Sequence, residues 1–292
     1  MKKAILLALI LSLFGCIKLN DIAFYNEPLS EYMLDDYNFE LDFRLDSTYS
    51  VQNIHEVSFS SGDYTIAAIY IGDISDIQND TVILYSHGQT RHIDHYWQRA
   101  KLLANCGGKE RFGVLIYDYR GYGKSEGVPT EEGMYEDVRA AMNWLKSWGV
   151  PTQQIINYGF SLGSAPATDL MAFGKDGDYP NKLILESPFA STDLLAQEST
   201  LIEVSAGYIT ELEFDNSEKI KQVSQPFMWL HGTDDDYVAI TNGEAIIANY
   251  TGSDSAYIRV EGANHGLDGV PQTMGYEAYL SAIEAFITQQ KD

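Results

Sequence analysis

The stretch NYGFSLGSAPA, residues 157–167, places Ser161 between Gly159 and Gly163, directly after an apolar run that is typical of a buried strand. This arrangement matches the pattern G-x-S-x-G, in which a serine lies on a sharp turn between a strand and a helix. The helical pattern at 162–173 supplies the second half of that context. Such a turn holds the serine in a strained backbone conformation, and a side chain at either glycine would collide with the neighbouring strand or helix. On this motif alone, Ser161 is either a nucleophile or a small residue in a tight turn, and the companion motifs in the rest of the chain favour the nucleophile.

The rest of the chain alternates between short apolar runs and helical patterns. The apolar runs lack a clean polar alternation, as expected for strands of a parallel sheet that helices cover on both faces. This order of strands and helices predicts an α/β fold with a mostly parallel, doubly wound sheet. The predicted strands are 81–86, 113–119, 155–160, 182–187, 226–231 and 256–261, and the predicted helices are 94–104, 162–173, 242–250, 273–288 and one that Thr130 caps and Gly149 ends.

Other segments depart from this alternation. Residues 55–59 and 64–71 flank the turn SSGD and predict a hairpin, so the sheet begins with antiparallel strands. In FELDFRLD, residues 39–46, phenylalanine and leucine alternate with charged residues, which predicts a half-buried strand packed on the domain. The segment 191–223 is too long for a tight connection, and we expect it to form a small helical cap over the site.

The composition of the chain excludes one class of partner. The 292 residues include 42 acidic and only 19 basic side chains, which gives a formal net charge of -23. Such a surface repels a polyphosphate backbone, so we expect no nucleic acid partner. Hydrophobic residues make up 45% of the chain, enough for one large domain with a sizeable core. Two cysteines cannot build a disulfide framework, and we expect Cys106 to be a free, inert thiol.

The N-terminus has the layout of an export signal. Lys2 and Lys3 precede an apolar stretch at 4–14, which is about 11 residues long and lies within the range of a signal-peptide core. It is well short of the roughly 20 apolar residues that span a bilayer. The sequence therefore predicts a signal peptide at 1–15 and an exported protein.

The end of this stretch, LFGC at 13–16, resembles the lipobox of bacterial lipoproteins. The resemblance implies that Cys16 is acylated and anchors the protein to a membrane of the bacterial cell envelope. Ile17 in place of an aspartate implies the outer membrane where the organism has one. The alternative is an ordinary secretory signal with a chance cysteine. We expect residues 16–50 to form an anchor and packing segment and residues 51–292 to form the main domain.

A serine hydroxyl becomes a good nucleophile only when a base removes its proton, and that base needs a carboxylate to orient it. Candidates for both roles follow predicted strands. Asp235 lies in HGTDDDYV, after the strand at 226–231, and His265 lies in EGANHG, after the strand at 256–261. Because α/β sheets place their sites at the carboxyl ends of strands, we predict that these two residues meet Ser161 there.

With these residues the chain resembles the α/β-hydrolase superfamily. The acid-loop pattern of that family, H-G-x-x-D-x-x-V, matches residues 231–238 and selects Asp235, with Ala239 where a proline is usual. The histidine-loop pattern G-x-x-H selects His265. The chain order of serine, aspartate and histidine is also that of the family.

Two more stretches resemble the same family. SHGQ at 86–89 is similar to its oxyanion turn, which implies that the backbone N–H groups of Gln89 and Leu162 hold the developing oxyanion. YDYRGYGKSEG at 117–127 matches the family segment D-x-R-G-x-G-x-S, which we interpret as structural. The resemblance extends from about residue 55 to the end of the chain.

The resemblance implies the α/β-hydrolase fold and a serine hydrolase that works through a Ser-His-Asp triad and an acyl-enzyme. A carboxylic ester is the favoured bond, with thioester and amide bonds left open, in a small-molecule or lipid-like acyl substrate. No cofactor and no metal are expected. The alternative is a catalytically silent lipoprotein that keeps the fold and acts in binding or scaffolding.

A weaker alternative is a metallohydrolase. His92, Asp94 and His95 form H-x-D-H, part of a metal-binding signature, but Thr90 stands where the first histidine belongs. We interpret these residues as the exposed start of the helix that follows the oxyanion turn.

Overall fold

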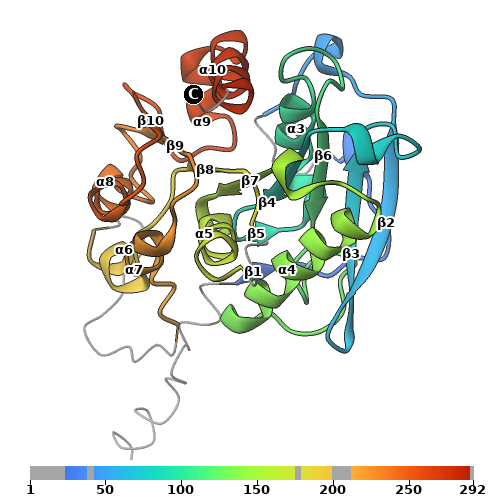
Figure 1. Ribbon diagram of the computed structural model, residues 1–292, viewed down its shortest axis with the longest axis horizontal. Helices are drawn as coiled ribbons and strands as arrows, with labels where there is room; N and C mark the ends of the chain where they lie inside the picture. Colours follow the sequence, from blue (N-terminus) through green and yellow to red (C-terminus); the bar gives the residue numbers. More distant parts are fainter. Residues whose placement is uncertain (1–23, 38–42, 175–178, 199–211, 290–292) are drawn as a thin grey trace, which may run out of the picture.

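The computed structural model describes residues 24–37, 43–174, 179–198 and 212–289. A sheet of eight strands runs through the described chain with helices on both faces (Figure 1). Its strand order is β10-β9-β8-β7-β4-β6-β3-β2. The bounds are β2 (Ile54–Ser61), β3 (Tyr64–Ile71), β4 (Val82–Ser86), β6 (Gly113–Tyr117), β7 (Ile155–Phe160), β8 (Lys182–Glu186), β9 (Phe227–Gly232) and β10 (Ser255–Val260).

The strand directions confirm the predicted fold class. Strands β4, β6, β7, β8, β9 and β10 pair in parallel. Strand β3 is antiparallel to both β2 and β6, so the predicted hairpin is present and the sheet begins with antiparallel strands. The sheet is therefore mixed only at one edge, and its parallel strands all end on the same side.

One predicted strand has a different environment from the one expected. Strand β10 is at the edge of the sheet, and its residues alternate between exposed and partly buried positions up to the buried Val260. Tyr257 and Arg259 are exposed, while Ala256 and Ile258 pack against the core. The expectation of burial on both faces was wrong for this strand because an edge strand has a neighbour on one side only.

The predicted helices are present, with small shifts at their ends. Thr130 caps its helix as expected, because its Oγ1 accepts the N–H of Gly133 at 3.0 Å. The helix predicted at 273–288 is divided into two by Gly275, whose φ of +82° lies in the left-handed region that favours glycine. The bounds are α3 (Ile93–Ala104), α4 (Glu131–Ser147), α5 (Ser164–Phe173), α8 (Ile240–Asn249), α9 (Gly269–Met274) and α10 (Tyr276–Thr288).

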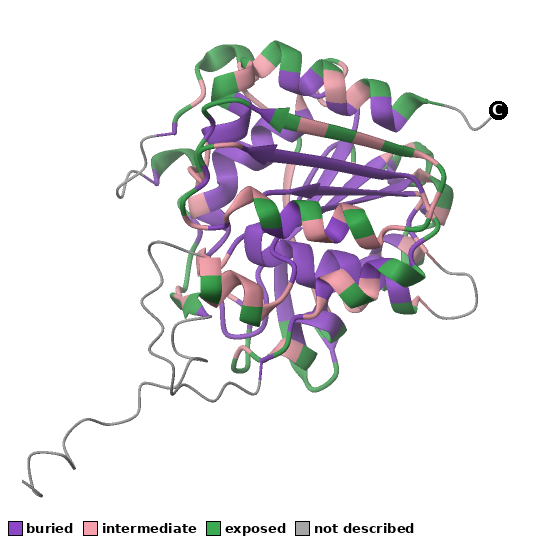
Figure 2. Cartoon of the chain, turned by 90° about the vertical axis from the view of Figure 1, so that its left-hand side faces the viewer, coloured by how far each residue is buried: buried purple, intermediate pink, exposed green. Residues whose placement is uncertain are grey.

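The core lies on both faces of the sheet, as Figure 2 shows by the buried colour of the central strands. Successive strand residues face opposite sides. Ile184 packs in one cluster with residues of α3 and α10, while its neighbours Leu183 and Leu185 pack in another with residues of α5 and α8. Helices on both faces leave the carboxyl ends of the parallel strands as the open edge where loops can build a site.

The segment before the hairpin also packs on the domain. The short strand β1 (Tyr25–Asn26) pairs in parallel with β5 (Thr90–Arg91), which follows β4. Phe43 is buried and contacts the ring of Tyr276. The packing expected for 39–46 is thus confirmed for its described part, but residues 43–46 form no strand, and the remainder lies outside the described residues.

The predicted cap segment, 191–223, holds two short α-helices in its described part. These are α6 (Thr192–Glu198) and α7 (Asn216–Lys219), and α7 packs against α5 and α8. Residues 199–211 lie outside the described residues. The covering of the site by this segment stays a prediction.

The predicted signal at 1–15 and the predicted lipidation site Cys16 lie outside the described residues as well. Across the ranges that the structure does describe, no helix combines the length and hydropathy needed to cross a bilayer.

Candidate active site

Three side chains from three loops meet at the carboxyl edge of the sheet. Ser161 follows β7, Asp235 follows β9 and His265 follows β10. Nε2 of His265 lies 2.9 Å from Oγ of Ser161, and Nδ1 of His265 lies 2.7 Å from Oδ2 of Asp235. The structure thus brings the three predicted residues into one hydrogen-bond chain, and it selects Asp235 from the run Asp234 to Asp236.

The turn at Ser161 has the backbone geometry that the motif requires. Ser161 has a φ of +51°, in the left-handed region, where a residue with a side chain is strained. A Cβ on Gly163 would lie 2.0 Å from the carbonyl oxygen of Ser86, and a Cβ on Gly159 would lie 2.5 Å from that of Gly163. Only glycine fits at either position, so the turn can approach β4 closely enough to present the hydroxyl at the sheet edge.

The Asp235 carboxylate has several donors besides His265. Its Oδ1 accepts the backbone N–H groups of Tyr237 at 3.1 Å and Val238 at 2.7 Å. Nε2 of His231 lies 3.3 Å from its Oδ2. Burial alone would raise the pKa of Asp235, but hydrogen bonds from His231 and His265 outweigh that cost and hold the pKa below its usual range. The group is therefore a carboxylate at neutral pH.

His231 supports Asp235, a role that the sequence analysis did not assign. The side chain is fully buried, and its Nε2 also lies 2.8 Å from the carbonyl of Val238. Nε1 of Trp229 points at its Nδ1 from 3.3 Å. A donor at Nδ1 leaves the proton on Nε2, which faces Asp235. The sequence did contain a signal for this role, because His231 occupies the first position of the acid-loop pattern, four residues before Asp235.

The predicted oxyanion turn lies beside Ser161. Gln89 and Ser161 line the same pocket, and Leu162 directly follows the serine. The turn is held from two sides: Oη of Tyr96 accepts the N–H of Thr90 at 3.0 Å, and the phenol of Tyr237 donates to Oε1 of Gln89 at 2.9 Å. The backbone near Gln89 is therefore fixed next to the position that a substrate carbonyl would occupy at Ser161.

A pocket of about 240 Å³ opens at the serine. One part of its wall is aromatic and apolar, and the other part carries polar groups. Burial, followed by the nearby charge of Arg91, lowers the pKa of His95 to about 4, so its imidazole is neutral at pH 7. The lining residues are Gln89, Thr90, His95, Tyr96, Phe160, Ser161, Tyr237, His265 and Leu267.

The H-x-D-H stretch is built differently from the sequence-based expectation. His92 and Asp94 are buried rather than exposed, because the N-terminal segment covers them. The carboxylate of Asp94 accepts the backbone N–H groups of Met33 at 2.9 Å and Leu34 at 2.8 Å. No group of three or more His, Cys, Asp or Glu in the described part of the chain is placed to hold a metal ion.

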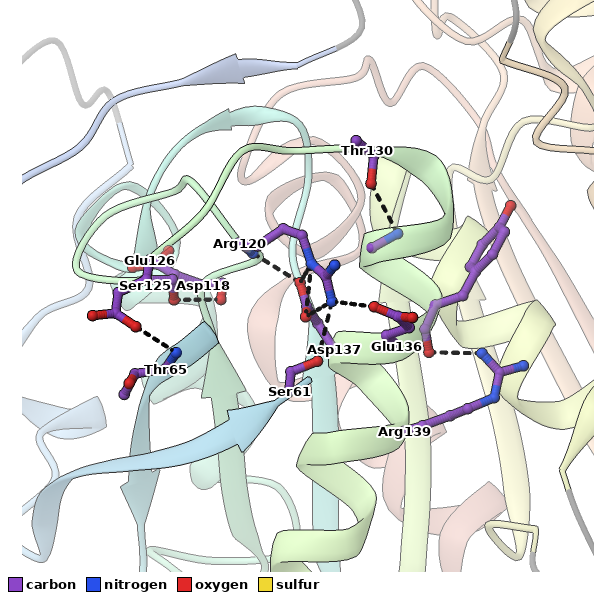
Figure 3. Close-up of polar contacts among 12 residues, drawn as sticks. Ser61, Thr65, Asp118, Arg120, Ser125, Glu126, Thr130, Glu136, Asp137 and Arg139 are labelled. Atoms are coloured by element: carbon purple, nitrogen blue, oxygen red, sulfur yellow. Dashed lines mark hydrogen bonds and ion pairs between the residues drawn. The ribbon is translucent and has the colours of Figure 1, made fainter. Parts of the chain in front are cut away.

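The segment after β6 forms a polar network in the loop that precedes α4 (Figure 3). Oγ of Ser125 donates to the carbonyl of Asp118 at 2.7 Å. Arg120 pairs with Asp137 at 2.8 Å and with Glu136 at 2.7 Å. The two ion pairs join the loop to α4, and Nη2 of Arg120 also donates to Oγ of Ser61 on β2 at 3.2 Å, which agrees with the structural role predicted for this stretch.

Cys106 is free, as predicted, and the structure shows that it is buried. Its Sγ lies 3.3 Å from the carbonyl of Leu280 on α10. Burial, together with the nearby carboxylate of Glu284, raises the pKa of the thiol to about 12, so almost no thiolate is present at neutral pH.

The sheet, its antiparallel first strands and the strained serine turn define an α/β-hydrolase fold. Residues 77–211 match the family model described as serine aminopeptidase, S33. A solved esterase from Pyrococcus furiosus superposes on the chain with a TM-score of 0.64 at 20% identity, covering 82% of this chain and 91% of the esterase.

Two curated relatives also match. Alpha/beta hydrolase domain-containing protein 17B of Homo sapiens is 29% identical over 209 residues, which cover 71% of this chain and 66% of the relative. Lysophosphatidylserine lipase ABHD12 of Danio rerio is 34% identical over 180 residues, which cover 56% of this chain and 46% of the relative. The aligned part therefore spans about two thirds or less of these relatives. Together with the fold, the matches support a hydrolase of the α/β-hydrolase superfamily.

Proposed function

We propose that this protein is a serine hydrolase that cleaves carboxylic esters through Ser161, His265 and Asp235. The observation that carries the proposal is the hydrogen-bond chain from Oγ of Ser161 through both ring nitrogens of His265 to Asp235. An ionised Asp235 accepts a hydrogen bond from the N–H at Nδ1 of His265. In the neutral imidazole the proton is then on Nδ1, and Nε2 carries none. Nε2 can then accept the proton of the Ser161 hydroxyl.

The chemistry follows from this arrangement. Oγ of Ser161 attacks the acyl carbon while Nε2 of His265 takes the hydroxyl proton. The carbonyl oxygen becomes an oxyanion, which the backbone N–H groups of Gln89 and Leu162 would hold; one such donor is worth roughly 3 kcal/mol. His265 then returns the proton to the departing alcohol, which leaves an acyl group on Ser161. A water molecule loses its proton to His265 and attacks the acyl carbon. The bond between that carbon and Oγ then breaks as His265 returns the proton to Oγ, which releases the acid and regenerates Ser161.

The substrate class rests on the pocket and on the relatives. A pocket with aromatic walls next to the serine suits an acyl group of a small-molecule or lipid-like ester. The names of two matched proteins, an esterase and a lipase, support an ester, whereas the name of the family model, serine aminopeptidase, points to an amide. A panel of esters graded by acyl length, with one thioester and one amide of the same acyl group, would test this choice.

The reaction of the folded protein with a fluorophosphonate probe tests the chemistry. Attack by an activated serine displaces fluoride and leaves a phosphonyl ester on the enzyme. We expect labelling of the wild type and of Ser164→Ala, a control in the same turn, and no labelling of Ser161→Ala. Absence of labelling in a folded wild-type sample would instead favour a catalytically silent binding lipoprotein.

We further propose that the protein is exported and anchored by an acylated Cys16 in the bacterial cell envelope, at the outer membrane where the organism has one. The charged, apolar and small residues of 1–16 support this proposal. In membrane fractionation, wild type is expected in the pellet and Cys16→Ser in the soluble fraction. A Cys16→Ser protein that stays in the pellet would refute the anchor and leave the chemistry untouched.

A further inference from the structure

Next to the His265 loop lies a buried ion pair that the mechanism above does not use. Nη1 of Arg99, on α3, lies 2.5 Å from Oε1 of Glu186, at the end of β8. Both side chains are fully buried. Burying two charges is costly, and apolar residues of the same volume often give equal or greater stability. The pair therefore needs an explanation other than stability alone.

The other contacts of Arg99 lead to the loop that carries His265. Nη2 of Arg99 donates a hydrogen bond to the carbonyl of Leu267, two residues after His265. The guanidinium carbon of Arg99 lies 4.1 Å from the ring centre of Phe160. That ring stacks on the imidazole of His265, with centroids 5.6 Å apart and an interplanar angle of 23°. Arg99 thus contacts both the backbone of the loop and the ring on which the imidazole rests.

The carboxylate of Glu186 determines how the guanidinium lies. Its Oε1 accepts a hydrogen bond from Nη1 of Arg99. Its Oε2 accepts hydrogen bonds from the phenols of Tyr158 and Tyr279, the latter at 2.8 Å. Tyr158 is on β7, two residues before Phe160. Because both carboxylate oxygens have partners, the planar guanidinium is held where it can also bond to Leu267 and stack on Phe160.

We propose that Arg99, oriented by Glu186, is a positioning residue that keeps the His265 imidazole between Asp235 and Ser161. The proposal rests on the proposed function, because it concerns the residue that serves there as the base. It requires a guanidinium: the ammonium of a lysine can pair with Glu186 but lacks the planar face and the fork that reach Phe160 and Leu267 together. Misplacement of a catalytic group by about 1 Å can cost roughly 100-fold in rate.

The test compares Arg99→Lys with Arg120→Lys, using steady-state kinetics on a short-chain aryl ester and thermal unfolding of each variant. Arg120 forms a similar buried pair with Asp137, in the loop between β6 and α4. For Arg99→Lys we expect kcat to fall about 10-fold to 100-fold while KM stays within about threefold. For Arg120→Lys we expect a lower melting temperature and an unchanged kcat. A folded Arg99→Lys with wild-type kcat would overturn the proposal.

A double variant, Arg99→Met with Glu186→Met, removes both buried charges at once and so avoids an unpaired ion. We expect it to fold and to show the same loss of kcat, and wild-type kcat in this variant would also overturn the positioning role. The rate of fluorophosphonate labelling gives the same readout in a partly unfolded sample, because only folded molecules react. Labelling of the wild type at Ser161 with unchanged rates in the Arg99 variants would refute the positioning role alone. A folded wild type that does not label would refute the proposed function itself.

Discussion

The phenol of Tyr237 donates a 2.9 Å hydrogen bond to Oε1 of Gln89 and thereby joins the acid loop to the oxyanion turn. The backbone N–H of the same tyrosine donates to Asp235 at 3.1 Å. Its ring centre lies 5.1 Å from that of His265. One residue therefore connects the loops that surround Ser161.

Replacement of this tyrosine tests whether the connection matters for the rate. Tyr237→Phe keeps the ring and removes one hydrogen bond, which is worth about 1 kcal/mol. Because Gln89 then loses a contact that fixes its position, we expect kcat to fall about fivefold, with a smaller change in KM. Tyr250→Phe is the control, since that phenol donates to the carbonyl of Gln225 at 2.6 Å, outside the pocket. Equal kcat values for the wild type and Tyr237→Phe would show that the turn holds its geometry without this bond.

The ionised state of Asp235 predicts a pH dependence of stability. Its pKa in the folded protein lies below its ordinary value of about 3.9, so its contribution to the free energy of unfolding is complete above about pH 4 and is lost as pH falls through the folded pKa. We expect Asp235→Asn to be about 1–3 kcal/mol less stable than the wild type at pH 7. Urea unfolding at pH 7, 5 and 3 should show that difference shrinking toward acid pH; a difference that grows there would contradict the assignment.

The same substitution should abolish most activity at every pH. An asparagine cannot stabilise the imidazolium of His265 and favours the wrong tautomer, which in serine hydrolases costs roughly 10,000-fold in kcat. Ester turnover by Asp235→Asn and by Asp234→Asn at pH 8 would check this, with Asp234→Asn expected near the wild-type rate. Similar losses in both variants would contradict the choice of Asp235 from the run.

The positions of Ser161, Asp235 and His265 could be predicted because each lies in a short pattern that follows an apolar run typical of a strand. The glycines of those patterns are set by local sterics, as at Gly163, where a Cβ would overlap the backbone of Ser86. Contacts between distant segments left no such pattern. The Arg99 bond to Leu267 joins residues 168 apart, and the Tyr237 bond to Gln89 joins residues 148 apart, so neither could be found without the fold.

The errors in the sequence-based prediction have the same physical origin. The start of α3 was expected to be exposed, but Asp94 is covered because the backbone of Met33 and Leu34 bonds to its carboxylate. Strand β10 was expected to be buried on both faces, although its place at the sheet edge leaves Tyr257 38% exposed. The burial of Asp94 and the exposure of β10 both depend on which segments are neighbours in the fold. Apolar periodicity in the sequence carries no information about those neighbours.

Far from the serine, Asp80 predicts a pH effect of the opposite sign. Burial raises the pKa of this carboxyl to about 6, despite the hydrogen bond from the phenol of Tyr70 at 3.0 Å. The pKa of Asp80 is higher in the folded protein than in the unfolded chain. Its stabilising contribution to the free energy of unfolding is therefore complete below about pH 4 and is lost as pH rises through 6. Asp80→Asn keeps an acceptor for Tyr70 and should raise the free energy of unfolding at pH 8 by about 1 kcal/mol, after allowance for solvent screening. Urea unfolding at pH 5 and pH 8 measures it, and a variant that is less stable than wild type at pH 8 would count against the raised pKa.

The N-terminal segment predicts a link between a distant end of the chain and the site. Strand β1 pairs with β5, directly after Gln89, and the phenol of Tyr32 donates to the buried carboxylate of Asp118 at 2.5 Å. Tyr32→Phe leaves that carboxylate short of a donor and should lower the free energy of unfolding by about 1–2 kcal/mol. Because the same segment flanks the oxyanion turn, we also expect a severalfold loss of kcat. Tyr25→Phe, at a side chain 59% exposed, should stay within about 0.5 kcal/mol of wild type in urea unfolding. If Tyr32→Phe matched Tyr25→Phe in both stability and kcat, the segment would be a passive covering with no influence on the turn.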